Sequence, residues 1–167
     1  MFHTLNEFAA SWAWEAGETQ KLFDVLTDAS LGQSVDPNGR SIGRIAWHIA
    51  QTIPEMMGRT GLHVTGLGEH DAVPTSASSI AGAYRAAAKS LLEQMRAEWT
   101  DASLTIKDDM YGEQWSRATT LGALIGHQGH HRGQLTVLMR QAGLVVPGIY
   151  GPAREEWGAM GMEPPVV

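Results

Sequence analysis

The sequence predicts an all-α fold, a four-helix bundle, and three observations carry this prediction. Four long segments repeat apolar residues at the three- and four-residue spacing of an amphipathic helix. Three non-trivial connections separate these segments, and strand-like alternation is too scarce for a sheet of any size. The 167 residues suit one ordinary domain with its own core, so we expect a single domain over residues 1–167.

The first predicted helix covers about residues 4–28. It opens with Thr4 and Glu7 at the spacing of a capping box, in which the two residues satisfy each other's backbone N–H groups. Apolar residues then recur at helical spacing through the rest of the segment. Residues 31–40 are rich in turn-forming types, and Asp-Pro-Asn-Gly at 36–39 is the strongest turn signal in the chain.

A second helix is predicted to begin after Ser41, a good N-cap, and its apolar stripe consists mainly of isoleucines. Pro54 should kink or end this helix near its last turn, because proline lacks the backbone N–H. The following stretch, 58–76, contains four glycines and shows little periodicity. Such a long irregular stretch indicates a crossover that lets the chain travel the length of the bundle.

A third helix is predicted over about residues 78–100, capped by Ser76 or Ser78. Its alanine run favours helix formation and close packing. Beyond it, residues 104–106 alternate like a strand and could pair with residues 113–116 in a short hairpin. An irregular loop is the equal alternative for this region.

The fourth predicted helix covers residues 121–141. Thr119 or Thr120 can serve as its N-cap, and Gly143 is a typical C-terminal stop. The prolines and glycines that follow indicate extended or turning chain, and residues 153–159 are predicted to form a short C-terminal helix.

Composition excludes several classes of protein. The chain has no cysteine, so disulfides, thiolate nucleophiles and cysteine metal sites are ruled out. A net charge of −6 with scattered basic residues argues against nucleic-acid binding. Neither a signal peptide nor an apolar run long enough for a membrane span is visible. We therefore expect a cytoplasmic protein with no nucleic-acid or membrane partner.

Three of the seven histidines lie in a five-residue span of the fourth predicted helix, residues 127–131. His127 and His131 are four residues apart, so they lie on one helix face with Cβ atoms roughly 5–6 Å apart. His130 points away from that pair. Two imidazoles thus interrupt an apolar stripe, and this interruption calls for an explanation.

The central hypothesis is a metal site formed by His48, His127 and His131. Neutral imidazole is the commonest metal ligand in proteins, and H-x3-H on a helix presents two of them from one rigid face. His48 is the other histidine that lies inside a strong helical segment. Three protein ligands leave a coordination position open for water, as in catalytic zinc sites. We expect a divalent metal, zinc or nickel first, although three histidines also accept iron and other ions.

The same spacing has a simpler interpretation. Two histidines four apart on a helix can be hydrogen-bonded core or surface residues that bind no metal. The motif also lacks the glutamate of H-E-x-x-H, and Gln128 stands in the glutamate's place. A zinc-protease mechanism is therefore unsupported, because a glutamine cannot act as a general base.

Several runs resemble the DinB/YfiT-like superfamily. These runs are SIGRIAWHIA at 41–50, HQGHHRGQL at 127–135, LMRQAG at 138–143 and VPGIYGP at 146–152. The resemblance implies a four-helix bundle in an up-down-down-up arrangement, which needs a long crossover between the second and third helices. It also implies a metal triad of one histidine from the second helix and an H-x3-H pair from the last. By motif, those residues are His48, His127 and His131, and all three match.

The resemblance leaves the reaction open between two classes. Some members of the superfamily are thiol-dependent S-transferases or isomerases that use low-molecular-weight thiols, and others look like metal-dependent hydrolases. In the first class the metal would activate a cosubstrate thiol, which suits a chain without cysteine. In the second class it would activate water.

Four side chains are weaker candidates for catalysis or substrate binding: Arg44, Glu55, Gln134 and Tyr150. Arg44 and Glu55 share the face of His48. Arg44 could receive an anionic substrate group and Glu55 could support a ligand or accept a proton, with an ion-pair role as the simpler interpretation for both. Gln134 could orient a ligand or form a plain hydrogen bond between helices. Tyr150 could close over the site or simply pack. His130 and Arg132 project off the ligand face and are expected at the surface or in an interface.

The leading functional hypothesis is a metal-dependent enzyme that acts on a small molecule, in one reading a low-molecular-weight thiol. The alternative is a non-catalytic metal-binding or stress-associated helical bundle. A third possibility is a metal-free helical dimer whose histidines only form hydrogen bonds. The tryptophans and methionines are expected mostly in the core, with some available for a dimer face, and we expect a homodimer.

Overall fold

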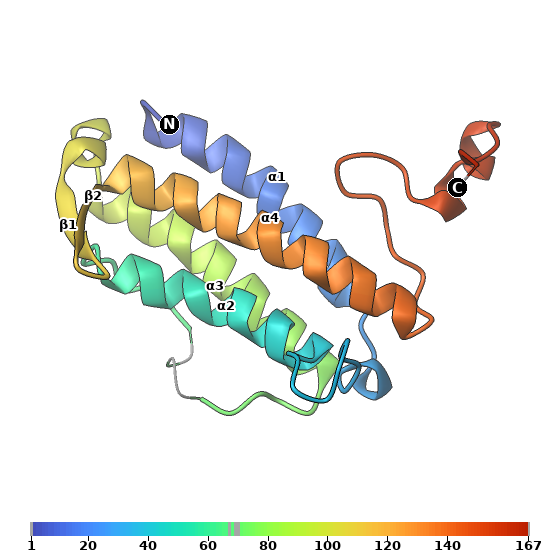
Figure 1. Ribbon diagram of the computed structural model, residues 1–167. Helices are drawn as coiled ribbons and strands as arrows, with labels where there is room; N and C mark the ends of the chain where they lie inside the picture. The colour runs from blue at the N-terminus through green and yellow to red at the C-terminus, as the bar shows by residue number, and fades with distance from the viewer. Residues whose placement is uncertain (1, 67, 69–70, 167) are drawn as a thin grey trace.

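Four long helices dominate the computed structural model, which describes residues 2–66, 68 and 71–166 (Figure 1). They are α1 (Leu5–Asp24), α2 (Ile42–Gly58), α3 (Ala77–Glu98) and α4 (Arg117–Gln141). Helices α1 and α2 each pack against both α3 and α4. In Figure 1, α1 and α4 run in one direction, whereas α2 and α3 run in the opposite direction. The prediction of a mostly helical fold is confirmed.

Helix α1 begins as the sequence predicts and ends earlier. The Thr4 hydroxyl accepts a hydrogen bond from the Glu7 backbone N–H at 3.1 Å, and the Glu7 carboxylate accepts one from the Thr4 N–H at 3.2 Å. The helix stops at Asp24 rather than near residue 28. A separate 3-10 turn follows, because the hydroxyls of Thr27 and Ser30 each bond the other residue's backbone N–H.

Helix α2 continues one turn past Pro54, so the proline does not end it there. Proline removes only its own N–H, and the residues after it can still form theirs. The crossover then leads from the end of α2 to the start of α3 at the other end of the bundle (Figure 1). It is fastened to α2, because the Trp47 indole donates to the Asp71 carbonyl and the Gln51 amide donates to the Gly68 carbonyl.

A small hairpin of β1 (Lys107–Met110) and β2 (Glu113–Ser116) lies at the end of the bundle. The predicted strand at 113–116 is present, but its partner is 107–110 and not 104–106, whose first two residues lie in a 3-10 helix. Leu104 is buried within that 3-10 turn, which accounts for its apolar character without a strand. Helix α4 begins four residues before the predicted start, because the Ser116 hydroxyl rather than a threonine caps it.

The C-terminal segment leaves the bundle after Gly143, whose φ of 75° ends α4 (Figure 1). The single short helix predicted at 153–159 is replaced by two 3-10 turns, Arg154–Glu156 and Gly158–Met160. Trp157 lies between the two turns and Gly158 begins the second, and glycine is a poor helix former. Within the described residues, no helix is both long enough and apolar enough to cross a membrane.

Candidate metal centre

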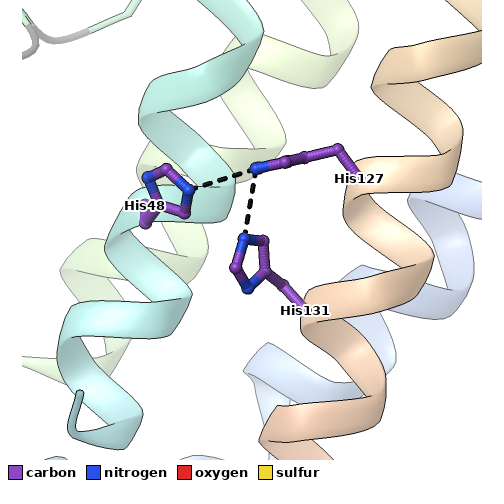
Figure 2. A group of neighbouring side chains, drawn as sticks. All are labelled: His48, His127 and His131. Carbon is purple, nitrogen blue, oxygen red and sulfur yellow. Dashed lines mark hydrogen bonds between the residues drawn. The ribbon is translucent and has the colours of Figure 1, made fainter. Parts of the chain in front are cut away.

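Three imidazoles from two helices meet between α2 and α4 (Figure 2). The Nε2 atom of His127 lies 3.1 Å from the Nε2 atom of His48 and 3.1 Å from that of His131. All three candidate ligand atoms lie within 4.8 Å of one another. For comparison, nitrogens about 2.0–2.1 Å from a tetrahedral zinc ion lie roughly 3.3 Å apart.

The local fold brings these side chains together for two reasons. His127 and His131 are one turn apart on α4, so their imidazoles project from the same face. Helix α2 packs against that face and supplies His48. His48 and His127 are 79 residues apart in sequence, so the cluster exists only in the folded chain.

The environment keeps the three imidazoles neutral. Burial, followed by the neighbouring histidines, lowers the pKa of His48 from 6.5 to about 4. Burial has the same effect on His127, whose pKa is also lowered to about 4. Burial lowers the pKa of His131 as well, against the opposing effect of its hydrogen bond with Gln134. Neutral imidazoles are the form that binds metal ions.

Gln134 fixes the tautomer of His131. The Nδ1 atom of His131 lies 2.7 Å from the Gln134 side-chain oxygen, which can only accept, so Nδ1 carries the hydrogen. The Nε2 atom of His131 therefore presents a lone pair to the cluster. The Gln134 amide nitrogen lies 3.2 Å from Nε2 of His130, an exposed residue outside the cluster. Such support of a ligating histidine through its other nitrogen is typical of metal sites.

Hydrogen bonds alone satisfy this cluster poorly. If His48 donates to His127, then the Nε2 lone pairs of His127 and His131 face each other at 3.1 Å. If His127 donates instead, it must share one hydrogen between two acceptors, and its own Nδ1 is buried without a partner among the described residues. A cation that accepts all three lone pairs removes this conflict. The residues present therefore fit a divalent metal ion.

A cavity of about 590 Å³ lies beside the cluster, and His48 and His127 form part of its wall. Its other walls come from the loop before α2, from α2 and α4, and from the hairpin. Those residues are Arg40, Arg44, Gln51, Thr52, Glu55, Met56, Arg59, Tyr111, Trp115 and Ala123. A second hollow of about 530 Å³ lies beside His131 and shares Arg40 with the first. Both volumes are in the range of small-molecule sites.

Two of the weaker candidates from the sequence line this cavity. The Arg44 guanidinium donates to the Gln51 side-chain oxygen at 3.3 Å. The Glu55 carboxylate accepts from Arg59 at 2.7 Å and from the Tyr111 hydroxyl at 2.8 Å. Glu55 therefore forms an ion pair, with Arg59 and not with Arg44.

Tyr150 is not brought to the histidines. The residue is 69% exposed, its ring packs on Trp14, and its hydroxyl contacts Arg132 and Glu15. The expectation that Arg132 lies at a surface or an interface is wrong, because the residue is only 2% exposed. It pairs with the Glu15 carboxylate and donates to the Glu15 carbonyl at 2.7 Å. Consecutive residues of a helix point about 100° apart, so Arg132, which follows His131, faces α1 rather than α2.

Sequence reasoning also missed Arg40, Tyr111 and Trp115, which lie in a loop or in the hairpin and line the cavity. Helical periodicity gives no information about such positions. The Tyr-Gly pair at 111–112 was the available signal, since a glycine in a two-residue connection is typical of a hairpin turn.

Comparisons with known proteins place these features in a family context. The model of the DinB family matches residues 1–164. The uncharacterized protein YrdA of Bacillus subtilis is 47% identical over 165 residues, which are 99% of each chain. The crystal structure of a DinB-like protein from Bacillus cereus has a TM-score of 0.87 and 47% identity, and the match covers 90% of this chain and 100% of that one. A DinB-like protein from Bacillus subtilis, YjoA, shares the fold with a TM-score of 0.68 and 14% identity, over 88% of this chain and 99% of that one.

Proposed function

The chain belongs to the DinB family, as its motifs predict, and on that premise we propose that it is a metal-dependent enzyme acting on a small molecule. One observation carries the proposal. Three neutral imidazoles direct their Nε2 atoms at one another beside a cavity of about 590 Å³. A site that only stabilised the fold would have no need of an adjoining cavity.

The proposed ligands are His48, His127 and His131, and the proposed ion is divalent, with zinc or nickel as the first candidates. When bound, such an ion lowers the pKa of a bound water to about 7, or stabilises the thiolate of a cosubstrate. The up-down-down-up helix arrangement belongs to this proposal, because it sets α2 beside α4 and so unites the ligands. The helix directions in Figure 1 support it.

The roles of the chain's own residues follow from their contacts. Gln134 holds His131 with its Nε2 lone pair toward the cluster. Because His48 and His127 line the cavity, a substrate placed there would lie against the ion. The chain has no cysteine, so in a thiol-dependent S-transfer or isomerisation the thiol would come from the cosubstrate. Hydrolysis is the other reaction class within the proposal.

Metal analysis tests the ligand set. Protein purified without chelator or nickel resin is expected to carry about one divalent ion per chain. His127→Ala and His131→Ala should each lose that ion, because two imidazoles remain where three converged. His130→Ala is the matched control on the same helix and should retain it.

Equal metal content in all four proteins would reject the site. Activity is then assayed on the metal-loaded protein, with thiol conjugation and with ester or amide hydrolysis as separate arms. A protein that binds metal but shows neither reaction, and whose cavity takes no small molecule, would be the non-catalytic metal-binding bundle instead. The homodimer and the cytoplasmic location remain predictions, and sedimentation of the purified chain tests the first.

A further inference from the structure

The cavity beside the histidines is cationic in an acidic protein. The chain has a net charge of −6, yet among the described residues three arginines and one carboxylate line this cavity. The carboxylate, Glu55, is held by Arg59 and by the Tyr111 hydroxyl. In the part of the chain that the structure describes, no carboxylate forms an ion pair with Arg40 or Arg44. Among the described residues, no carboxylate therefore competes with an anionic ligand for these two guanidinium groups, although Arg44 also donates to the Gln51 side-chain oxygen at 3.3 Å.

These two arginines lie at the histidine end of the cavity. Arg44 precedes His48 by one turn of α2, so their Cβ atoms are about 5–6 Å apart. Arg40 lines both the cavity beside His48 and the hollow beside His131, which places it between the two hollows that flank the cluster. Positive charge gathered in a concave site attracts anions and raises their local concentration.

Toward the hairpin the cavity also has apolar lining residues, beside the ion pair of Glu55 and Arg59. Met56 lies two turns beyond His48 on α2, which is about 12 Å along the helix axis. Trp115 from β2 and Ala123 from α4 also line the wall. The cavity thus has a cationic end beside the histidines and apolar side chains about 12 Å farther along the axis of α2.

The hairpin turn holds Tyr111 in a conformation that tyrosine rarely adopts. Its φ is 61°, in the left-handed region that favours glycine and asparagine, and Gly112 follows with a φ of 89°. The conformation directs the ring under the Arg59 guanidinium, 4.4 Å away, and the hydroxyl onto Glu55. Strained residues that persist are concentrated at ligand sites. Here the Tyr111 hydroxyl and Arg59 engage Glu55, the carboxylate that lines the cavity among the described residues, and it forms no ion pair with Arg40 or Arg44.

From these contacts we propose that the cavity binds an organic acid with an apolar or aromatic group. The acid group lies between Arg40 and Arg44, and the apolar group lies against Met56 and Trp115. Tyr111 is a positioning residue that closes the far wall and engages Glu55. This inference rests on the proposed function, whose substrate class it names.

Calorimetric titration of the metal-loaded and metal-free proteins tests the inference. The probes are phenylacetate, 3-phenylpropionate and 4-phenylbutyrate, each paired with its neutral amide. We expect at least one acid to bind at least tenfold more tightly than its amide, because charge-assisted hydrogen bonds to guanidinium are stronger than neutral ones. The double variant Arg40→Gln with Arg44→Gln should lose that preference. Arg96→Gln, an exposed arginine of α3, is the matched control and should keep it.

Two arms separate this inference from the proposed function. In the metal-free protein an acid cannot coordinate an ion, so its preference over the amide depends on the arginines alone. The metal content of every variant is measured in parallel. If the unsubstituted protein binds no metal but still prefers the acid to its amide, the metal site is rejected and the acid site is supported. Equal binding of each acid and its amide, or an unchanged preference in the double variant, overturns the inference.

Tyr111→Asn gives a readout that a purely structural role would not produce. Asparagine suits the left-handed position, so the melting temperature should not fall. Binding of the preferred acid should nevertheless weaken by about threefold or more, because the far wall is lost and Glu55 keeps only Arg59 as a partner, which leaves its negative charge less well neutralised inside the cavity. Unchanged affinity in this variant would remove Tyr111 from the site.

Discussion

Helix α4 carries two polar clusters, one on each side, and they differ in how their groups are paired. On the side facing α2, the histidine cluster of His48, His127 and His131 brings three Nε2 atoms together that hydrogen bonds satisfy poorly in either tautomer of His127. On the side facing α1, Arg132 meets the Glu15 carboxylate, the Glu15 carbonyl and the Thr19 hydroxyl, so donors face acceptors. Hydrogen bonds leave the first arrangement incompletely paired, which is compatible with a cation, whereas they largely complete the second.

The α1 side extends inward through Gln128. Its side-chain oxygen accepts from the Tyr84 hydroxyl at 2.8 Å and from the Thr19 hydroxyl at 3.3 Å. Burial raises the pKa of Tyr84, which therefore stays a neutral donor. Two donors, Arg132 Nε and the Gln128 amide nitrogen, have no partner among the described residues. This network fastens α4 to α1 and α3.

The difference teaches that burial alone does not mark a functional site. His131 and Arg132 are neighbours in sequence and are only 6% and 2% exposed. What separates them is the pairing of their polar atoms and the presence of a cavity, which adjoins the histidines. Changes on the α1 side should therefore affect stability, and changes on the α2 side should affect metal binding.

Arg132→Met tests the α1 side and should have the largest effect on stability. Removing Arg132 leaves the mostly buried Glu15 carboxylate without its cationic partner, and this costs about 3–5 kcal/mol in the free energy of unfolding. Urea denaturation measures it. Arg140→Met is the matched control, because Arg140 pairs with Glu155 at the surface, where an ion pair contributes about 1 kcal/mol or less. Metal content should be normal in both variants. A loss of metal in Arg132→Met would contradict the claim that the two clusters act independently.

Gln134→Leu tests the α2 side through the residue that orients a proposed ligand. Without the acceptor for His131 Nδ1–H, metal affinity should fall by about 10- to 100-fold, as is usual when such a supporting hydrogen bond is lost. Competition with a chelator of known affinity measures the change. Gln134→Glu keeps the acceptor and should restore most of the affinity. If leucine and glutamate behave alike, the hydrogen bond does not support the metal site.

Acid should weaken the metal-free protein through the same three histidines. Above pH 6.5 these residues are neutral in both the folded and the unfolded chain, and their contribution to stability is fully present. As the pH falls from 6.5 toward 4, the unfolded chain binds protons while the folded chain resists them, so stability is lost. The urea midpoint of the metal-free protein should show this fall.

The double variant His48→Gln with His127→Gln isolates the histidine contribution to that pH dependence, since all other titrating groups remain. Its urea midpoint should fall less steeply between pH 6.5 and 4 than that of the unsubstituted protein. Parallel curves would show that the cluster does not resist protonation. In the metal-loaded protein the same protons compete with the ion, so metal affinity should also decline below about pH 6.5.

Much of the site was predictable because it depends on helical spacing. The four-residue interval between His127 and His131 predicts a shared face, and the motif around His48 links it to them. The burial of Arg132 was not predictable, because it depends on which side of α4 the first helix covers. Arg40 and Tyr111 lie outside regular helices, where periodicity carries no information. Small errors at element ends, as at Thr27 and Ser116, came from hydroxyl groups that competed to cap adjacent turns.

The distance along the chain between His48 and His127 has a consequence for folding. An ion held by both residues would close a loop spanning 79 residues, which includes the crossover, α3 and the hairpin. Such a tie restricts the unfolded chain as a disulfide does, in a protein that has no cysteine with which to form one. Unlike a disulfide it would open with acid or a chelator rather than with a reductant.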